Sequence, residues 1–127
     1  TIVILGRGIT AGAPIARMVT KYGVTPAVIH SKTKHPERII KSADILISCV
    51  GRKHTVANES IKKGSILIGV GLCRNEDGTY SGDYDEADIM ETASWYTPTP
   101  GGVGPVNVSC LMKNLVLSYT KSIRGKL

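Results

Sequence analysis

Short runs of consecutive apolar residues alternate along the first half of the chain with segments in which apolar residues recur every three or four positions. The runs are rich in Ile, Val and Leu without polar alternation, which is typical of strands buried on both faces of a parallel sheet. The intervening segments have the spacing of helices with one buried face. We therefore predict an α/β fold with a single domain over residues 1–127. The predicted strands are residues 2–5, 27–30, 44–50 and 65–71, and the predicted helices are residues 14–22, 36–43 and, weakly, 54–63.

The first strand ends abruptly in Gly6-Arg7-Gly8, and a third glycine, Gly12, comes just before Pro14 at the predicted helix start. Glycines at such a turn let the backbone reverse and approach a ligand, and the free N–H groups of the next helix favour an anion. The spacing G-x-G-x-x-x-G is one residue longer than the dinucleotide-binding fingerprint. The turn predicts phosphate binding, and a glycine-rich turn without a ligand is the alternative.

The net charge of +6 is concentrated in the first half of the chain. Residues 1–64 carry 11 Lys and Arg against 3 Asp and Glu, whereas residues 65–127 carry 5 against 7. Only Tyr22 supplies an aromatic ring in the basic half, so the stacking surfaces of a single-strand nucleic-acid binder are missing. The pattern indicates a small polyanionic ligand and argues against a nucleic-acid partner.

No apolar run approaches the length of about 20 residues that spans a bilayer, so we expect no membrane role. The three cysteines, Cys49, Cys73 and Cys110, are widely separated and form no C-x-x-C pair. We expect neither a metal site nor disulfides, and a reducing, cytoplasmic compartment. The chain opens on Thr1, already inside an apolar strand, and we expect it to be part of a longer protein.

The second strand ends in His30-Ser31-Lys32-Thr33-Lys34, where a dinucleotide-binding domain often carries Asp or Glu for the adenosine ribose. Hydroxyl and cationic groups would instead bind a 2′-phosphate, and Arg7 in the first turn should lie nearby. These residues favour NADP over NAD. A solvated basic loop is the alternative, and His30 alone is typical of a partly buried strand residue.

Glycines also follow the third and fourth predicted strands. In open α/β sheets, ligands bind outside the carboxyl ends of the strands, so these glycines should converge on one crevice and leave room for a flat cofactor. They are Gly6, Gly8, Gly51, Gly69 and Gly71.

The second half of the chain is less regular. Residues 72–85 are polar, contain an Asp77-Gly78 turn and predict an exposed hairpin or loop with solvated acidic side chains. A helical turn over 87–93 and a last short strand over 94–97 follow. Residues 98–105, PTPGGVGP, combine stiff prolines with permissive glycines, as in the wall of a shaped cleft. A long amphipathic helix over 106–122 and a short basic tail end the chain.

Several of these stretches together resemble the cofactor domain of the methylenetetrahydrofolate dehydrogenase/cyclohydrolase family. The resemblance implies a Rossmann-like, three-layer domain with a mostly parallel twisted sheet that binds NADP. It also implies oxidation of 5,10-methylenetetrahydrofolate, often followed by hydrolysis of the methenyl product. The stretches that carry it are GRGITAGAPIA, HSKT, ADILISCVG, IKKGS, GVG, Gly82-Asp83 and, most specifically, TPTPGGVGP.

The resemblance also implies residue roles. Arg7 and Ser31 match positions that hold the 2′-phosphate, Gly71-Leu72 a backbone near the nicotinamide, and Pro100-Gly101-Gly102 the loop between nicotinamide and folate. This loop often has a cis proline in relatives, so we expect a cis Thr99–Pro100 bond. The expected cofactor-binding residues are Gly6, Arg7, Gly8, Thr10, Gly12, His30, Ser31, Lys32, Cys49, Val50, Gly51, Gly71, Leu72 and Asn107, and the expected substrate-binding residues are Pro100, Gly101 and Gly102.

Three positions depart from the family pattern: Gly8 stands where Ser is usual, Gly69 where Asp is usual, and Asn107 where Thr is usual. The family's catalytic lysine and tyrosine lie in a preceding amino-terminal domain, so we expect no catalytic residue in this chain. A tetrahydrofolate derivative would bind jointly with that domain, and a homodimer is expected. The alternatives are an inactive NADP-binding or scaffold domain of this family, and a relative of shikimate dehydrogenase.

Overall fold

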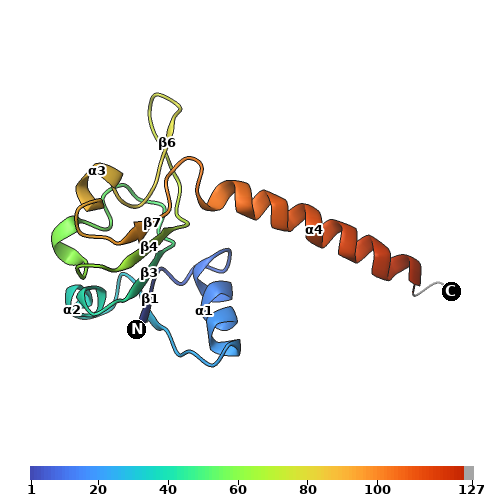
Figure 1. Ribbon diagram of the computed structural model, residues 1–127, viewed down its shortest axis with the longest axis horizontal. Helices are drawn as coiled ribbons and strands as arrows, with labels where there is room; N and C mark the ends of the chain where they lie inside the picture. The colour runs from blue at the N-terminus through green and yellow to red at the C-terminus, as the bar shows by residue number, and fades with distance from the viewer. Residues whose placement is uncertain (125–127) are drawn as a thin grey trace.

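The computed structural model, which describes residues 1–124, is built around a five-stranded parallel sheet (Figure 1). The strand order is β2-β1-β3-β4-β7, so the chain passes from β1 outward to β2 and then returns to the other side of β1. The order reverses between β1 and β3, and open α/β sheets bind ligands at such a point. The strands are β1 (Ile2–Leu5), β2 (Ala27–Ile29), β3 (Ile45–Ser48), β4 (Ile66–Gly69) and β7 (Trp95–Tyr96).

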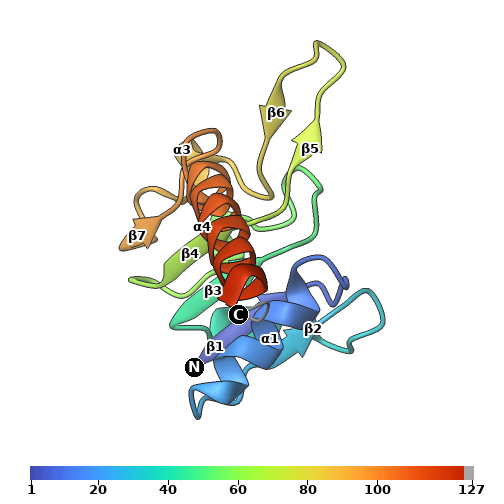
Figure 2. The same ribbon diagram turned by 90° about the vertical axis from the view of Figure 1, so that its right-hand side faces the viewer.

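Helices cover the sheet on both faces. Helix α1 (Gly12–Lys21) lies on one face, and α2 (Pro36–Lys41) and α3 (Glu86–Ile89) lie on the other (Figures 1 and 2). The 3₁₀ turn η1 (Asn58–Ser60) packs beside α2. The α/β fold expected from the apolar pattern and the three-layer domain implied by the resemblance are therefore confirmed.

The largest group of buried side chains lies between the sheet and the α2 and α3 layer. Val3, Leu46 and Leu67, from β1, β3 and β4, are at most 1% exposed and pack with Ile89 of α3. Because side chains alternate between the faces of a strand, Ile4 points to the opposite, α1 face. It is also fully buried, as expected for a strand covered on both sides.

The element bounds differ from the predictions mainly in the weakly periodic segments. The helix predicted over 54–63 is reduced to η1, while α1 begins at Gly12, two residues before Pro14. Residues 72–85 form the predicted hairpin, with β5 (Cys73–Arg74) antiparallel to β6 (Tyr80–Ser81). The prediction that the acidic residues of this segment are all solvated is wrong for Asp83, which is fully buried.

Helix α4 (Val103–Arg124) projects from the side of the sheet that carries α1 and extends away from the rest of the molecule (Figure 1). The predicted helix is confirmed, and it begins three residues earlier, inside the proline- and glycine-rich loop. The basic tail lies largely outside the described residues. None of the helices described is long and apolar enough to cross a membrane. The exposed apolar side chains of α4 are Val106, Val108, Leu111, Met112, Leu115, Val116, Leu117, Tyr119 and Ile123.

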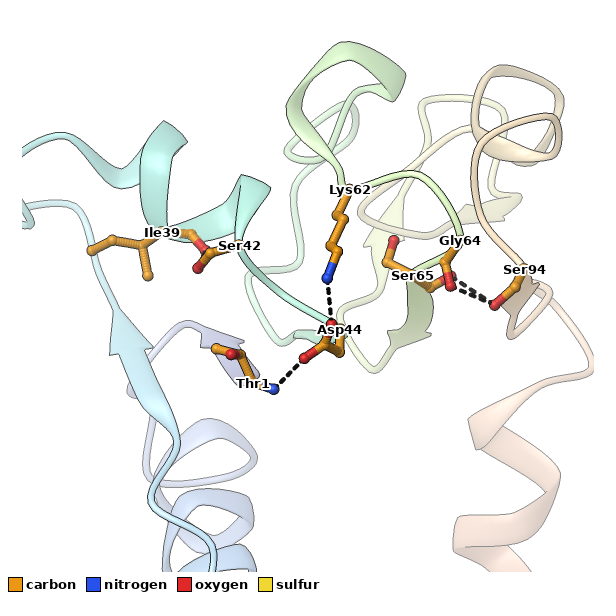
Figure 3. Close-up of polar contacts among 8 residues, drawn as sticks. All are labelled: Thr1, Ile39, Ser42, Asp44, Lys62, Gly64, Ser65 and Ser94. Atoms are coloured by element: carbon orange, nitrogen blue, oxygen red, sulfur yellow. Dashed lines mark hydrogen bonds and ion pairs between the residues drawn. The ribbon is translucent and has the colours of Figure 1, made fainter.

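Side chains connect the amino ends of the strands (Figure 3). Asp44, just before β3, accepts hydrogen bonds from the amino group of Thr1 and, at 2.6 Å, from Lys62 Nζ. Ser94, just before β7, donates to the carbonyl oxygens of Gly64 at 2.8 Å and Ser65 at 3.2 Å. The opposite, carboxyl ends of the strands are therefore the ones left to form a site.

Candidate functional site

Two cavities open at the carboxyl ends of the strands, each of about 650 Å³. The first, which we call the basic cavity, lies beside the ends of β1, β2 and β3. Two arginines line it, and none of its lining residues is acidic. The lining residues are Leu5, Gly6, Arg7, Gly8, Ile29, His30, Ser31, Pro36, Ile40, Cys49, Val50, Arg52 and Thr55.

The second, which we call the apolar cavity, lies between the start of α1, the end of β4 and the loop that leads into α4. Its lining carries no acidic, basic or histidine side chain. The lining residues are Thr10, Ala11, Pro14, Ile15, Met18, Gly69, Val70, Leu72, Tyr80, residues 98–105 and Asn107.

The turn after β1 separates the two cavities and is fixed by close backbone packing. Gly6 has φ +99°, and its N–H donates to the carbonyl of Ile29 at 2.8 Å. A Cβ at Gly6 would lie 2.8 Å from the carbonyl oxygen of Cys49, and one at Gly12 would lie 2.1 Å from that of Gly6. A Cβ at Gly8 would meet nothing within 4 Å. Gly6 and Gly12 therefore fix the turn, while the backbone at Gly8 is open to a ligand.

Helix α1 presents a free amino end beside this turn. Its N-cap, Ala11, makes no side-chain hydrogen bond, and no acidic residue occupies the first turn. The start of a helix carries a partial positive charge, and of its first amides here Ala13 donates to the Gly8 carbonyl at 3.0 Å and Pro14 has no N–H, which leaves the N–H of Gly12 for a ligand. An anion such as a phosphate is suited to this position.

A tight turn presents the residues after β2. Thr33 donates its N–H to the carbonyl of His30 at 2.8 Å and accepts the His30 N–H on its hydroxyl at 3.0 Å. The N–H of Lys32 donates to His30 Nδ1 at 3.2 Å. This network holds the turn that brings Ser31 to the basic cavity, which Arg7 also lines. The side chain of Lys32 lines neither cavity.

The loop after β3 closes the basic cavity on its other side. Burial, and then the negative charge of Asp83, raise the pKa of the Cys49 thiol to about 11, so it remains protonated near neutral pH. Gly51 has φ +72° and packs on Gly71, where a Cβ would lie 2.4 Å from the Gly51 nitrogen. Gly51 and Gly71 thus pack beneath the site and line neither cavity.

The loop over residues 98–105 forms the far wall of the apolar cavity. Its Thr99–Pro100 bond is cis, which confirms that expectation. Gly101 has φ +101°, a conformation that favours glycine. A Cβ at Gly102 would lie 2.4 Å from the carbonyl oxygen of Pro98. The prolines and glycines of this loop therefore build one specific shape.

Hydrogen bonds with α3, Tyr84 and the end of β4 fix this loop and the residues just before it. The N–H of Thr99 donates to Glu86 Oε1 at 2.7 Å, and the Tyr84 hydroxyl donates to the carbonyl of Thr97 at 2.7 Å. The Thr97 hydroxyl accepts the N–H of Gly69 at 2.8 Å. Burial raises the pKa of Tyr84, which keeps its hydroxyl a donor. A Cβ at Gly69 would lie 3.0 Å from the Tyr84 hydroxyl, which is a physical reason for glycine there.

This arrangement of turn, helix start and proline-glycine loop has a counterpart in one family. The profile of the NAD(P)-binding domain of tetrahydrofolate dehydrogenase/cyclohydrolase matches residues 1–123. The chain belongs to this family. The resemblance noted from the motifs alone is therefore confirmed, and the described fold is that of the family's NAD(P)-binding domain.

Curated relatives and solved structures agree with this assignment. The chain is 38% identical over 125 residues to the bifunctional protein FolD of Ligilactobacillus salivarius, covering 98% of this chain and 44% of the relative. It is 40% identical over 124 residues to FolD of Lacticaseibacillus casei, and the match again covers 98% of this chain and 44% of the relative. The chain thus spans less than half the length of these relatives.

Two solved structures show the same fold at similar identity. The bifunctional FolD enzyme of Campylobacter jejuni superposes with a TM-score of 0.89 at 35% identity, over 95% of this chain and 43% of that one. The methylenetetrahydrofolate dehydrogenase-cyclohydrolase of Trypanosoma brucei was solved with NADP cofactor and an inhibitor. It superposes with a TM-score of 0.87 at 36% sequence identity, over 97% of this chain and 44% of that one.

The residues of this chain fit the cofactor of the family. The open backbone at Gly8 and the uncapped start of α1 suit a pyrophosphate, while Gly6 and Gly12 leave no room for a side chain that would change the turn. A basic cavity adjoins the turn on one side and an apolar cavity on the other. The two cavities and the turn between them offer room for an extended, phosphate-containing ligand.

Most of the expected site residues line one of the two cavities, and four of them line neither. Gly6, Arg7, Gly8, His30, Ser31, Cys49 and Val50 line the basic cavity. Thr10, Leu72, Pro100, Gly101, Gly102 and Asn107 line the apolar cavity. Among the lining residues described for these two cavities, Gly12, Lys32, Gly51 and Gly71 do not occur.

Sequence reasoning missed Arg52 and Thr55 in the basic cavity. Arg52 follows Gly51 directly, and a basic residue after a strand-ending glycine was the available signal. Within residues 1–124, no group of three or more His, Cys, Asp or Glu is placed to hold a metal ion.

Proposed function

We propose that this chain is the NADP-binding part of an enzyme that oxidises 5,10-methylenetetrahydrofolate to the methenyl form. The observation that carries the proposal is the basic cavity, which Arg7, Ser31 and Arg52 line and in which no lining residue is acidic. A carboxylate at this place would repel a 2′-phosphate, whereas guanidinium and hydroxyl groups donate hydrogen bonds to it.

Each part of the crevice has a binding role in this proposal. Arg7 and Ser31 hold the 2′-phosphate, and the start of α1 holds the pyrophosphate. Cys49 and Val50 lie against the adenosine ribose, and the Leu72 backbone lies beside the nicotinamide carboxamide. When bound, NADP supplies the acceptor for the hydride.

The loop over residues 98–105 positions the reacting partners. Pro100, Gly101 and Gly102 separate the nicotinamide from the folate and exclude water from the space between them. The apolar cavity offers no acidic, basic or histidine side chain among its described lining residues, so hydride transfer here depends on orientation. A cyclohydrolase step needs acid–base groups, which we assign to the remainder of a longer protein.

One observation favours a second candidate, an inactive NADP-binding or scaffold domain. The three departures from the family pattern all lie in the cavities: Gly8 in the basic one, and Gly69 and Asn107 in the apolar one. Changed contacts there would act on catalysis without removing the fold.

Isothermal titration of the purified protein with NADP and with NAD tests the cofactor. We expect NADP to bind at least about tenfold more tightly, equivalent to about 1.4 kcal/mol from the 2′-phosphate. Binding of 2′,5′-ADP without comparable binding of 5′-AMP would locate the preference in the basic cavity. Equal affinity for NAD and NADP would contradict the proposal.

Turnover separates the two candidates. The protein in its longest natural form is mixed with NADP and 5,10-methylenetetrahydrofolate, and methenyl formation is followed by absorbance. Production of the methenyl product supports the dehydrogenase. NADP binding without turnover supports the inactive binding domain.

We also propose a homodimer formed through the sheet edge. Trp95 on the edge strand β7 is 74% exposed, which is unusual for the largest apolar side chain on an unpaired strand edge. Light scattering of the purified protein should give twice the monomer mass, and Trp95→Ser should shift it towards the monomer. A monomeric wild-type protein would contradict this assignment.

A further inference from the structure

Asp83 is fully buried, and both oxygens of its carboxylate accept hydrogen bonds from the end of β3 and the loop that follows it. Oδ2 accepts the Ser48 hydroxyl at 2.6 Å and the N–H of Val50 at 3.0 Å, and Oδ1 accepts the N–H of Arg52 at 2.9 Å. The three donors belong to the end of β3 and the loop that follows, 31 to 35 residues away along the chain. The hairpin segment therefore reaches across the sheet to bind the loop at the basic cavity.

No cation pairs with this carboxylate among the salt bridges of residues 1–124. Burying an unpaired charge is costly, and here three hydrogen bonds compensate it. These three bonds tie the side chain to one short stretch of backbone and one hydroxyl. Two of its donors are backbone N–H groups on either side of Gly51, whose positive φ turns them to the same side.

The surrounding backbone is shaped around this carboxylate. A Cβ at Gly71 would lie 2.3 Å from Asp83 Oδ2 and 2.4 Å from the Gly51 nitrogen. Glycine is thus required at position 71 for the carboxylate and the loop to meet. The glycines after β3 and β4, which the sequence assigned to the crevice, serve this contact.

We propose that Asp83 is a positioning residue for cofactor binding, which holds the loop over residues 49–52 in the form that lines the basic cavity. Its own side chain lines neither cavity. Its bonds to the amides of Val50 and Arg52 turn those groups inward, so that the Val50 and Arg52 side chains face the cavity. This inference rests on the proposed function, because it concerns the same cavity.

Asp83→Asn is the first variant, because it keeps the size and one acceptor oxygen while removing the charge. We expect the dissociation constants of NADP and of 2′,5′-ADP to rise by the same factor, roughly 10-fold to 100-fold, from hydrogen bonds lost to a charged group. The equal factor arises because both ligands occupy the basic cavity.

Asp88→Asn is the matched control. The Asp88 carboxylate also connects distant segments, accepting the N–H of Asn58 at 2.9 Å, but it lines neither cavity. Ile89→Val, which removes one methylene from a fully buried side chain, controls for lost stability. Both should retain wild-type affinity for NADP, and a loss in Ile89→Val equal to that in Asp83→Asn would reduce Asp83 to a structural role.

Cys49 gives a readout at the loop itself. Wild-type Cys49 should react slowly with a maleimide at pH 8, and NADP should slow it further, since the thiol lines the basic cavity. Because removing the Asp83 charge lowers the pKa of Cys49 and by itself speeds labelling, the informative quantity is protection: in Asp83→Asn we expect NADP to slow the labelling of Cys49, relative to the exposed Cys110, less than in the wild type. Peptide mass spectrometry measures both cysteines in one sample.

Ser48→Ala keeps the proposal testable if Asp83→Asn does not fold. It removes one donor to the carboxylate and should raise the NADP dissociation constant severalfold in the same direction. Wild-type affinity and wild-type protection of Cys49 by NADP in a folded Asp83→Asn or Ser48→Ala protein would overturn the inference while NADP binding stands. A wild-type protein that does not bind NADP would instead contradict the proposed function.

Discussion

The two ends of the parallel sheet are closed in different ways. At the amino ends, exposed side chains make the connections, as in the contact of Asp44 with Lys62 (Figure 3). At the carboxyl ends, glycine backbone packs against backbone, and the carboxylates of Asp83 and Glu86 accept backbone N–H groups from loops distant in the sequence. Exposed ion pairs contribute little to stability and tolerate exchange, whereas backbone packing at contact distance tolerates no added atom. The sequence constraints of function and of fold therefore coincide at the carboxyl ends.

The largest loss of stability should come from adding one carbon atom to a glycine of the turn at the carboxyl ends of the strands. Gly12→Ala places a Cβ 2.1 Å from the Gly6 carbonyl oxygen, where only backbone could move. We expect a loss of about 3 kcal/mol in the free energy of unfolding and loss of NADP binding. Gly8→Ala, which meets nothing within 4 Å, should change stability by less than about 0.5 kcal/mol. Urea denaturation measures both, and equal stabilities would refute the distinction between the two glycines.

A charge removed at the basic cavity should act on the ligand and leave the fold intact. Arg7→Ala should cost about 1–3 kcal/mol of NADP affinity through the lost charge-assisted contact, with little change for NAD. Arg17→Ala, at an exposed position on α1, removes the same charge away from the cavities and is the control. Calorimetric titration gives all four affinities. A similar loss in both variants would mean that only net charge matters.

A smaller loss of stability is expected from a substitution that removes a hydrogen bond to the segment before the loop over residues 98–105. Tyr84→Phe removes the hydrogen bond to the Thr97 carbonyl and should lower the free energy of unfolding by about 1 kcal/mol. Because Tyr84 lines neither the basic nor the apolar cavity, affinity for 2′,5′-ADP should be unchanged. A large loss of 2′,5′-ADP binding would show that the two cavities are not independent.

The smallest effect is expected at the amino ends. A hydrogen bond from Lys62, followed by one from the amino group of Thr1, lowers the pKa of Asp44 from 3.8 to about 2. Since the folded pKa is the lower one, the contact contributes stability above about pH 4 and loses it as the pH falls towards 2. Asp44→Asn should remove only this part of the pH dependence, measured as thermal unfolding from pH 6 to pH 2. Its NADP affinity at pH 7 should equal that of the wild type.

The apolar pattern was sufficient to predict the sheet. Runs such as residues 2–5 and 44–50 are long, β-branched and bounded by glycine, and local sequence determines such elements. The segment over 54–63 has weak periodicity, and there the tertiary contacts of a single 3₁₀ turn decide the structure.

The interior of the site could not be predicted in the same way. Asp83 stands among other acidic residues of a polar hairpin, and although the Gly82-Asp83 pair belongs to the family pattern, nothing in the segment predicts that Asp83 is buried while Asp77 and Asp85 are exposed. Its burial depends on partners 31 to 35 residues away, a separation at which one sequence carries no pairing signal. Arg52 was missed for the same reason, because its place depends on how the loop is held.

The last residues of the loop that lines the apolar cavity are the first residues of the projecting helix α4, since α4 begins at Val103. With 22 residues, the helix is about 33 Å long at 1.5 Å per residue. Because one end of this helix forms part of the cavity wall, a rotation of about 10° at that end moves the other end by about 6 Å. The direction of α4 and the position of the cavity wall beside Gly102 are thus joined by one continuous piece of backbone.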